Sequence, residues 1–185
     1  MAHTLCPWWL GYGLLSPIRR LREDPSEALS PFIRDGMIVL EPGPGMGFFT
    51  LEAARLVGPS GRVVAVDLQP RMLAVLARRA ARAGLGDRIE TRTARPETLG
   101  VADLAGKVNV VLALHVVHEL PDAGVFFAEA SDTLKPGGAL LLAEPKGHVS
   151  EAEFGASVAA AERAGLRRGG GVAGVWGRTA RFVKA

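Results

Sequence analysis

The nine residues VLEPGPGMG, at positions 39–47, decide how this chain folds. Apolar residues at 37–40 predict a short buried strand, and three glycines at alternate positions predict a tight loop after it. Residues 48–57, rich in Ala, Leu and Glu, predict a helix that follows the loop. Glycines let the backbone take positive φ and let a ligand approach without a Cβ in its way. The stretch therefore predicts a ligand cradle between a strand and a helix.

The spacing of these glycines indicates which class of ligand the loop can bind. A dinucleotide fingerprint needs glycines at positions 1, 3 and 6, but counting from Gly43 the sixth position is Phe48. The pattern is instead acidic-x-Gly-x-Gly-x-Gly, with Glu41 at the end of the predicted strand. A carboxylate there would repel a pyrophosphate and would attract a cationic group such as an amine or a sulfonium.

Length and composition indicate one domain. The chain has 185 residues, 48% of them hydrophobic and 22% charged, as is typical of a globular protein with a full-sized core. Its single cysteine, Cys6, excludes an internal disulfide and favours a reducing compartment. We expect no secretory signal, because the first residues lack a positively charged region. We expect no membrane-spanning helix, because the longest apolar stretches, 5–15 and 108–117, are shorter than the roughly 20 residues needed. The prediction is a cytoplasmic protein.

The net charge of +3 could suggest a nucleic-acid partner, and so could the isoelectric point near 9.5. The basic residues are mostly Arg, and they form no long run. We therefore interpret the charge as a composition bias and expect no specific nucleic acid.

Strand and helix patterns alternate after residue 37. The predicted strands are 62–67, 88–93, 108–114, 139–143, 166–175 and 179–184, and the predicted helices are 70–83, 122–134 and 151–164. Continuous apolar strands between helices are typical of a parallel sheet covered on both faces. The last two strands lack a helix between them, so we expect an antiparallel C-terminal hairpin at one edge.

The first 34 residues predict a separate helical segment. Aromatic side chains crowd positions 5–22, where Trp8, Trp9 and Tyr12 are followed by several arginines. Glycines and a proline divide this stretch into short helices, and Ser26 could cap a further helix up to residue 29. One interpretation is a lid over the ligand site, with the three aromatic side chains as walls of the substrate pocket. A second is an extra helical layer on the sheet, and a third is a peripheral membrane anchor.

Asp67 closes the second predicted strand, 20 residues after Gly47. A carboxylate at this place can accept hydrogen bonds from both ribose hydroxyls of an adenosine group. NAD-binding proteins share this feature, but not its combination with Glu41 and the G-x-G-x-G loop. We expect Asp67 to contact the ribose.

Three downstream segments complete the pattern: IETRTARPETL at 89–99, VNVVLALH at 108–115 and LKPGG at 134–138. Together with the glycine loop they resemble the class I S-adenosylmethionine (SAM) dependent methyltransferases over about residues 35–184. The general layout is similar to the small members related to ubiquinone and menaquinone methyltransferases. The resemblance implies an α/β, Rossmann-like, doubly wound, mostly parallel seven-stranded sheet with an N-terminal helical lid at 1–34 and a SAM-binding domain at 35–185.

The resemblance also implies SAM as the cofactor and methyl transfer to a small, apolar or aromatic molecule. The cofactor-binding residues that it implies are Glu41, Gly43, Pro44, Gly45, Gly47, Asp67, Leu68, Met72, Thr93, Ala94, Leu112 and Ala113. Two positions depart from the family pattern, because Thr93 and Asn109 each stand where Asp is usual. These departures leave open a SAM-binding module without turnover. The basic isoelectric point leaves open an RNA or protein methyltransferase.

Three histidines follow the fourth and fifth predicted strands and are the candidate catalytic residues. His115 and His118 are three residues apart, so on a helical turn they would share a face, and His148 lies in the loop after strand five. One of them could be a general base, and His115 is also expected to line the substrate pocket. No metal site is expected, because two histidines and a glutamate here match no metal signature.

Overall fold

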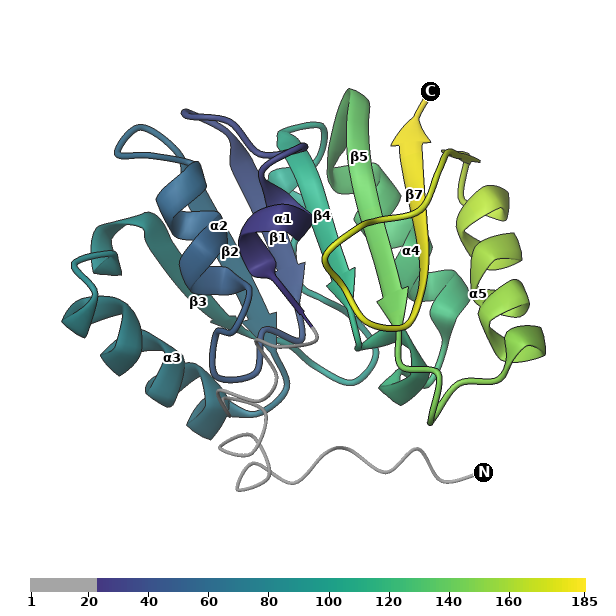
Figure 1. The fold of residues 1–185 in the computed structure, drawn as a ribbon, viewed down its shortest axis with the longest axis horizontal. Helices are drawn as coiled ribbons and strands as arrows, with labels where there is room; N and C mark the ends of the chain where they lie inside the picture. The colour runs from purple at the N-terminus through teal and green to yellow at the C-terminus, as the bar shows by residue number, and fades with distance from the viewer. Residues whose placement is uncertain (1–22) are drawn as a thin grey trace.

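A seven-stranded sheet in the order β3-β2-β1-β4-β5-β7-β6 forms the centre of the molecule (Figure 1). The computed structural model describes residues 23–185. The first five strands run parallel, while β7 runs antiparallel to both β5 and β6. The predicted α/β, mostly parallel sheet with an antiparallel C-terminal hairpin is confirmed.

The strands are β1 (Ile38–Pro42), β2 (Arg62–Asp67), β3 (Ile89–Thr93), β4 (Val108–Leu114), β5 (Leu134–Glu144), β6 (Leu166–Arg168) and β7 (Arg178–Lys184). The helices are α1 (Pro25–Leu29), α2 (Thr50–Leu56), α3 (Pro70–Arg82), α4 (Ala123–Thr133) and α5 (Glu151–Arg163), with short 3-10 turns η3 (Gly86–Arg88), η4 (Ala102–Leu104) and η5 (Val117–Glu119).

The strand order reverses direction between β1 and β4. From β1 the chain moves outward through β2 and β3, then returns to place β4 on the other side of β1. The arrowheads of the parallel strands reach the lower edge of the sheet in Figure 1, and β7 points the opposite way. Ligands of open α/β sheets bind outside the carboxyl ends of the strands at such a reversal. The fold therefore places the candidate site beyond the ends of β1 and β4.

Alternate residues of the inner strands enter two separate cores, one on each face. Val39 packs with Leu29 and Phe49 beneath α1 and α2. Its neighbour Leu40 joins the larger cluster that holds Phe127 of α4. Both faces are covered, which is why the strands are apolar along their whole length rather than alternating.

Strand β5 is longer than the predicted 139–143. It pairs with β4 from Leu134 onward, but the register jumps from Val108↔Leu134 to Val110↔Ala139. The predicted turn at 135–138 is thus a bulge inside β5, and Gly137 adopts a φ of +76° within it. Between these two pairs β5 contains residues 135–138 and β4 contains only Asn109, so the extra residues of β5 bulge out and accommodate the turn sequence.

Strand β6 is shorter than the predicted 166–175 and ends at Arg168. Residues 169–177 form a loop that runs in front of β4 and β5 toward α1 (Figure 1). The Gly174 carbonyl accepts a hydrogen bond of 2.8 Å from the backbone N–H of Asp24. A Cβ at Gly174 would lie 2.7 Å from the backbone nitrogen of Ala28, so the loop meets α1 too closely for any side chain there.

Helix α1 begins two residues earlier than a Ser26 cap would allow. The side chain of Asp24 accepts hydrogen bonds from the backbone N–H groups of Ser26, at 2.8 Å, and Glu27, at 3.2 Å. Asp24 is therefore the N-cap, and Ser26 lies inside the helix.

Most of the predicted helical lid, including Trp8, Trp9 and Tyr12, lies outside the described residues. Its described end, with α1, is buried: Leu29 and Ile33 belong to the same core cluster as α2. None of the helices within residues 23–185 has the length and hydrophobicity to cross a membrane.

Candidate functional site

A cavity of about 360 Å³ lies at the carboxyl ends of β1, β2 and β4. Five segments line it: the glycine loop, the end of β2, residues 94–99 after β3, the exit of β4, and the start of α4 with the loop before it. The volume is typical of a small-molecule site. The cavity therefore occupies the place that the strand reversal predicts.

The three alternate glycines of the loop have three different surroundings. An added Cβ at Gly43 would lie 2.5 Å from a methyl group of Val116, and one at Gly47 would lie 2.3 Å from Leu76. Gly45, with a φ of +54°, would meet nothing within 4 Å and borders the cavity. Gly43 and Gly47 thus permit packing of the loop onto its neighbours, whereas Gly45 keeps space open for a ligand.

Asp67 borders the cavity at the end of β2. Its carboxylate accepts a hydrogen bond of 2.8 Å from the backbone N–H of Gln69, and the backbone N–H of Gly43 donates a hydrogen bond of 2.8 Å to the carbonyl of the preceding residue, Val66. Burial raises the pKa of Asp67 above its ordinary value, and the backbone hydrogen bonds oppose that rise. The glycine loop and the acidic end of β2 are therefore tied together at the cavity.

Residues 94–99 form the part of the cavity wall that follows β3, and α4 holds them in place. Glu129 of α4 accepts a hydrogen bond of 2.7 Å from the backbone N–H of Leu99 and another from the Thr98 hydroxyl. All three residues line the cavity. One carboxylate therefore holds a loop that has no regular secondary structure of its own.

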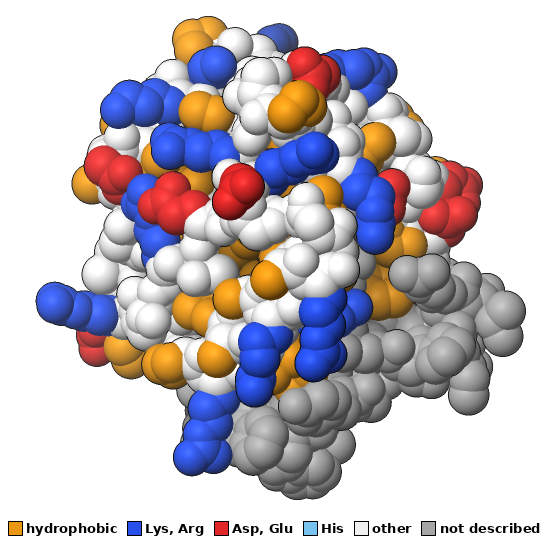
Figure 2. Space-filling model, turned by 90° about the vertical axis from the view of Figure 1, so that its left-hand side faces the viewer, with side chains coloured by type: hydrophobic (Ala, Val, Ile, Leu, Met, Phe, Trp, Pro, Cys, Tyr) orange, Lys and Arg blue, Asp and Glu red, His pale blue; other side chains and the backbone are white. Residues whose placement is uncertain are grey.

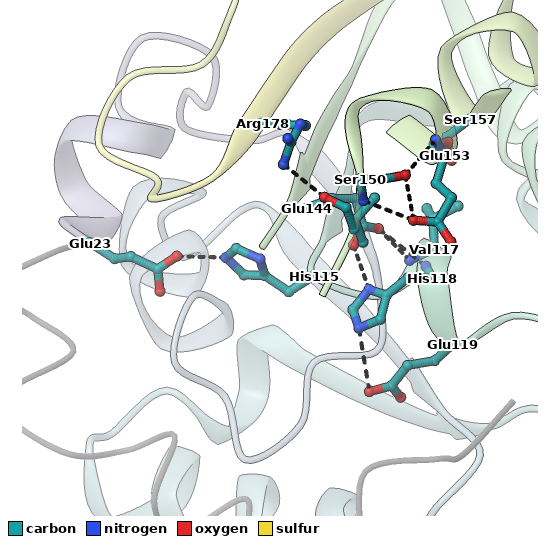
Figure 3. Close-up of polar contacts among 11 residues, drawn as sticks. Glu23, His115, Val117, His118, Glu119, Glu144, Ser150, Glu153, Ser157 and Arg178 are labelled. Atoms are coloured by element: carbon teal, nitrogen blue, oxygen red, sulfur yellow. Dashed lines mark hydrogen bonds and ion pairs between the residues drawn. The ribbon is translucent and has the colours of Figure 1, made fainter. Parts of the chain in front are cut away.

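His115 lies at the exit of β4 and borders the cavity. Its φ of +61° is the only positive value of a non-glycine residue among residues 23–185. Its Nε2 lies 2.5 Å from a carboxylate oxygen of Glu23 (Figure 3), and its buried Nδ1 has no hydrogen-bond partner among the described residues. A non-glycine residue in the left-handed region costs conformational energy, and residues strained in this way cluster at functional sites. The backbone conformation of His115 therefore supports a site at this position.

His118 points away from His115 and contacts a different carboxylate (Figure 3). Its Nδ1 contacts Glu144, and its ring stacks on His148 with centroids 6.3 Å apart. The expected shared face does not form, because His115 precedes η5 in a left-handed conformation instead of continuing its turn. His118 and His148 do not line the cavity.

The predicted cofactor residues divide into two groups. Those that line the cavity are Gly43, Gly45, Asp67, Leu68, Met72 and Ala94. Those that do not line it are Glu41, Pro44, Gly47, Thr93, Leu112 and Ala113.

Burial and strand position explain why residues of the second group do not line the cavity. Leu112 and Ala113 are fully buried in the two cores, and Glu41 is 3% exposed at the end of β1. Thr93 is an exposed residue of β3, so the side of the cavity expected from it is formed by the residues that follow.

Residues 95–99 and the start of α4 line the cavity without having been predicted. The rule that ligands bind beyond strand ends could have identified 95–99, since they follow β3 directly. Glu129 and Phe126 depend on how α4 docks, which no local pattern encodes. No group of three or more metal-ligating side chains occurs within residues 23–185.

Comparison with known proteins places the chain in a family. Residues 40–142 match a protein-family model described as "Methyltransferase domain". A ubiquinone/menaquinone biosynthesis C-methyltransferase from Hahella chejuensis is 35% identical over 60% of this chain and 44% of that protein. A ubiquinone biosynthesis O-methyltransferase from Caulobacter vibrioides is 32% identical over 74% of this chain and 57% of that protein. The chain spans about half the length of these curated relatives.

A solved structure supports the same assignment over the whole chain. A SAM-dependent methyltransferase from Aquifex aeolicus superposes with a TM-score of 0.85 and 25% identity, covering 98% of this chain and 100% of that one. The chain therefore belongs to the methyltransferase domain family, whose Rossmann-like members use SAM as cofactor. Other relatives are named for arsenite and for a ribosomal protein, so the family alone does not select an acceptor.

Proposed function

We propose that this chain transfers a methyl group from SAM to a small molecule bound in the cavity. The observation that carries the proposal is the meeting of Gly45 and Asp67 on one wall of that cavity. The open space beside Gly45 would accept a ligand against the backbone, and the Asp67 carboxylate is placed to accept hydrogen bonds from ribose hydroxyls. Open space beside the backbone and a carboxylate acceptor therefore together fit an adenosine-containing cofactor.

Other predicted residues take roles around this pair. Leu68 and Met72 supply apolar contacts beside Asp67, and so does Ala94, whose backbone N–H donates a hydrogen bond to the Asp67 carbonyl. Glu41 would attract the cationic end of the cofactor from the end of β1. When bound, the cofactor supplies an activated methyl group, and the chain's residues hold, orient and shield the reactants.

The acceptor that we propose is small and apolar or aromatic. Apolar residues line the side of the cavity around the exit of β4 and the start of α4, namely Val116, Leu120, Pro121, Val125 and Phe126. His115 borders the same region and is our candidate for direct contact with the acceptor. The quinone-pathway names of two relatives agree with an acceptor of this chemistry.

A binding module without turnover finds less support in the structure than in the sequence. The Asn109 side chain accepts a hydrogen bond of 2.9 Å from the backbone N–H of Ile38, at the start of β1. It therefore acts at the end of the sheet opposite the cavity. The Asn109 side chain thus has a structural role. Its departure from the family pattern gives no reason to expect loss of methyl transfer.

An RNA or protein acceptor also lacks a specific supporting observation. In Figure 2 Asp and Glu side chains lie among the Lys and Arg side chains of the upper half, and apolar side chains separate the basic ones of the lower half. Several arginines are neutralised locally, as where Arg92 pairs with Asp103 and Glu90. Basic side chains that are dispersed or paired in this way do not form a continuous basic surface for a nucleic-acid backbone.

Calorimetry with SAM and with S-adenosylhomocysteine tests the cofactor part of the proposal. We expect a saturable heat with one site per chain, and no heat at high protein concentration would refute it. Radiolabelled methyl transfer to a panel of small phenols, amines and thiols then tests turnover. SAM binding without transfer to any acceptor, RNA and protein included, would instead identify a binding module.

A further inference from the structure

A buried carboxylate, a histidine and a second carboxylate connect the end of β5 to the cavity (Figure 3). The first is Glu144, which is fully buried. Its Oε1 accepts hydrogen bonds from the backbone N–H groups of Val117, at 2.8 Å, and His118, at 3.3 Å. Its Oε2 contacts Nδ1 of His118. The carboxylate thus fixes both the backbone of η5 and the ring that η5 carries.

These contacts determine which ring nitrogen of His118 holds the proton. A carboxylate accepts hydrogen bonds, so Nδ1 is the donor in the pair. In the neutral ring the lone pair then lies on Nε2, and that nitrogen can accept a proton. The hydrogen bond to Glu144 is the largest cause that raises the pKa of His118 above its ordinary value, and it outweighs the burial that lowers it.

The Nε2 side of the ring faces Glu119. The distance from His118 Nε2 to a carboxylate oxygen of Glu119 is 4.0 Å, which one bridging water or a small side-chain rotation closes. Glu119 itself lines the cavity on the side of the apolar residues proposed to hold the acceptor. The row Glu144, His118, Glu119 therefore leads from a buried strand end to the place where an acceptor would lie.

We propose that Glu119 and His118 remove a proton from the methyl acceptor, that Glu144 is the positioning residue for His118, and that the acceptor is a neutral hydroxyl compound of the phenol class. This inference rests on the proposed function and specifies its substrate class. In the step, the acceptor oxygen forms a bond to the methyl carbon as the carbon–sulfur bond breaks, and the electron pair of that bond stays on sulfur. The hydroxyl proton passes through the Glu119 carboxylate to Nε2 of His118 and later to solvent.

The apolar wall explains why a base is needed here. A hydroxyl beside Leu120 and the buried Phe126 cannot shed its proton to bulk water at low cost, because an unpaired anion in apolar surroundings is strongly disfavoured. An acceptor that arrives already ionised, such as a thiolate, would be repelled by Glu119 and would not need the relay.

The test compares two acceptors that differ in whether the hydroxyl is ionised. Phenol remains neutral near pH 7, whereas 4-nitrophenol is largely ionised at pH 8. With phenol, Glu119→Gln and His118→Asn should each lower kcat by about 100-fold or more, the typical scale of general base catalysis. With 4-nitrophenol at pH 8, His118→Asn should stay within about 3-fold of the wild type, because no proton is left to remove. Glu119→Gln should lose nothing and should gain activity with this anion, because the carboxylate that repels it is gone. Glu151→Gln, an exposed carboxylate at the start of α5, is the matched control.

A pH profile separates the positioning role of Glu144 from a merely structural one. His118 must be neutral to act, so kcat with phenol should rise with pH through the raised pKa of His118. The groups that face its ring are Glu144 from β5, Glu119 from η5 and His148 from the loop before α5, while Arg178 of β7 donates to the Val149 carbonyl. Glu144→Gln removes the main cause of the raised pKa, so the rise should move to lower pH and reach a lower plateau.

The outcomes distinguish the relay from the proposed function. Each variant is first checked for a cooperative unfolding transition above the assay temperature and for SAM affinity by calorimetry. Equal losses with both acceptors, an unshifted profile in Glu144→Gln, or transfer to thiolates alone would overturn the relay while SAM binding persisted. Failure of the wild-type chain to bind SAM would overturn the proposed function itself.

Discussion

The backbone N–H of Gly43 donates a hydrogen bond of 2.8 Å to the carbonyl of Val66, which joins the start of the glycine loop to the end of β2. Gly45 and Asp67, the two residues expected to touch the same cofactor, are therefore held near each other before any ligand binds. A site whose donors and acceptors are already in place loses less freedom on binding than one that must assemble.

Asp67→Asn tests the ribose contact. The amide keeps the size of the side chain but loses the charge and one acceptor oxygen, so the dissociation constant for SAM should rise about 10- to 100-fold, the scale of a hydrogen bond to a charged group. Calorimetry measures it, and Asp87→Asn, at an exposed carboxylate of η3, is the control. Equal affinity in the two variants would remove Asp67 from the site.

Gly45→Ala tests the open space in the loop. A Cβ at φ +54° would project where the cofactor is proposed to lie, so SAM affinity should fall by more than about tenfold. Gly84 provides a matched control, because it also has a positive φ, of +67°, and open space around it, but it does not line the cavity. Both alanine variants should lose similar stability, about 1 kcal/mol, from the left-handed backbone. If Gly84→Ala lost as much SAM affinity as Gly45→Ala, the effect would be one of folding.

Glu129→Ala tests whether the Glu129 carboxylate holds residues 94–99 in position. Without its carboxylate the Leu99 N–H and the Thr98 hydroxyl lose their acceptor, and the cavity wall formed by residues 94–99 should loosen. We expect SAM affinity to fall about 3- to 10-fold, or roughly 1 kcal/mol, because the two lost hydrogen bonds are only partly buried and act on the cofactor indirectly. Hydrogen exchange should show faster exchange of the Leu99 amide. Glu162→Ala on α5 should change neither quantity, and slow Leu99 exchange in Glu129→Ala would contradict the assigned role.

The stability of the fold should depend on the pH at which His118 titrates. Its pKa is raised in the folded chain, so the folded state binds a proton more tightly than the unfolded state does. The resulting stabilisation is complete below the unfolded value of about 6.5 and is lost as pH rises through the folded pKa. Denaturant unfolding of the wild type between pH 6 and 9 should show this decline. Glu144→Gln should flatten it, and an equally steep decline in that variant would assign the slope to other groups.

Local patterns predicted the sheet and one wall of the site. The apolar strands, the glycine loop and Asp67 each follow from residues within a few positions of one another. The remaining contacts join residues far apart in sequence: 26 positions separate His118 from Glu144, 30 separate Leu99 from Glu129, and 92 separate His115 from Glu23. A single sequence contains no periodicity that encodes such pairs, since they arise only when β4, β5 and α4 dock.

The placement of β7 between β5 and β6 has a consequence for synthesis on the ribosome. Residues 178–184 pair with both neighbours, so β5 keeps an open edge until they leave the exit tunnel. A nascent chain that has emerged only as far as α5 therefore exposes the unpaired backbone of Leu140 and Leu142, and exposed strand edges favour aggregation. Pausing or premature termination in this last stretch should make the chain depend on chaperones, although the cavity-lining residues have all been made by then.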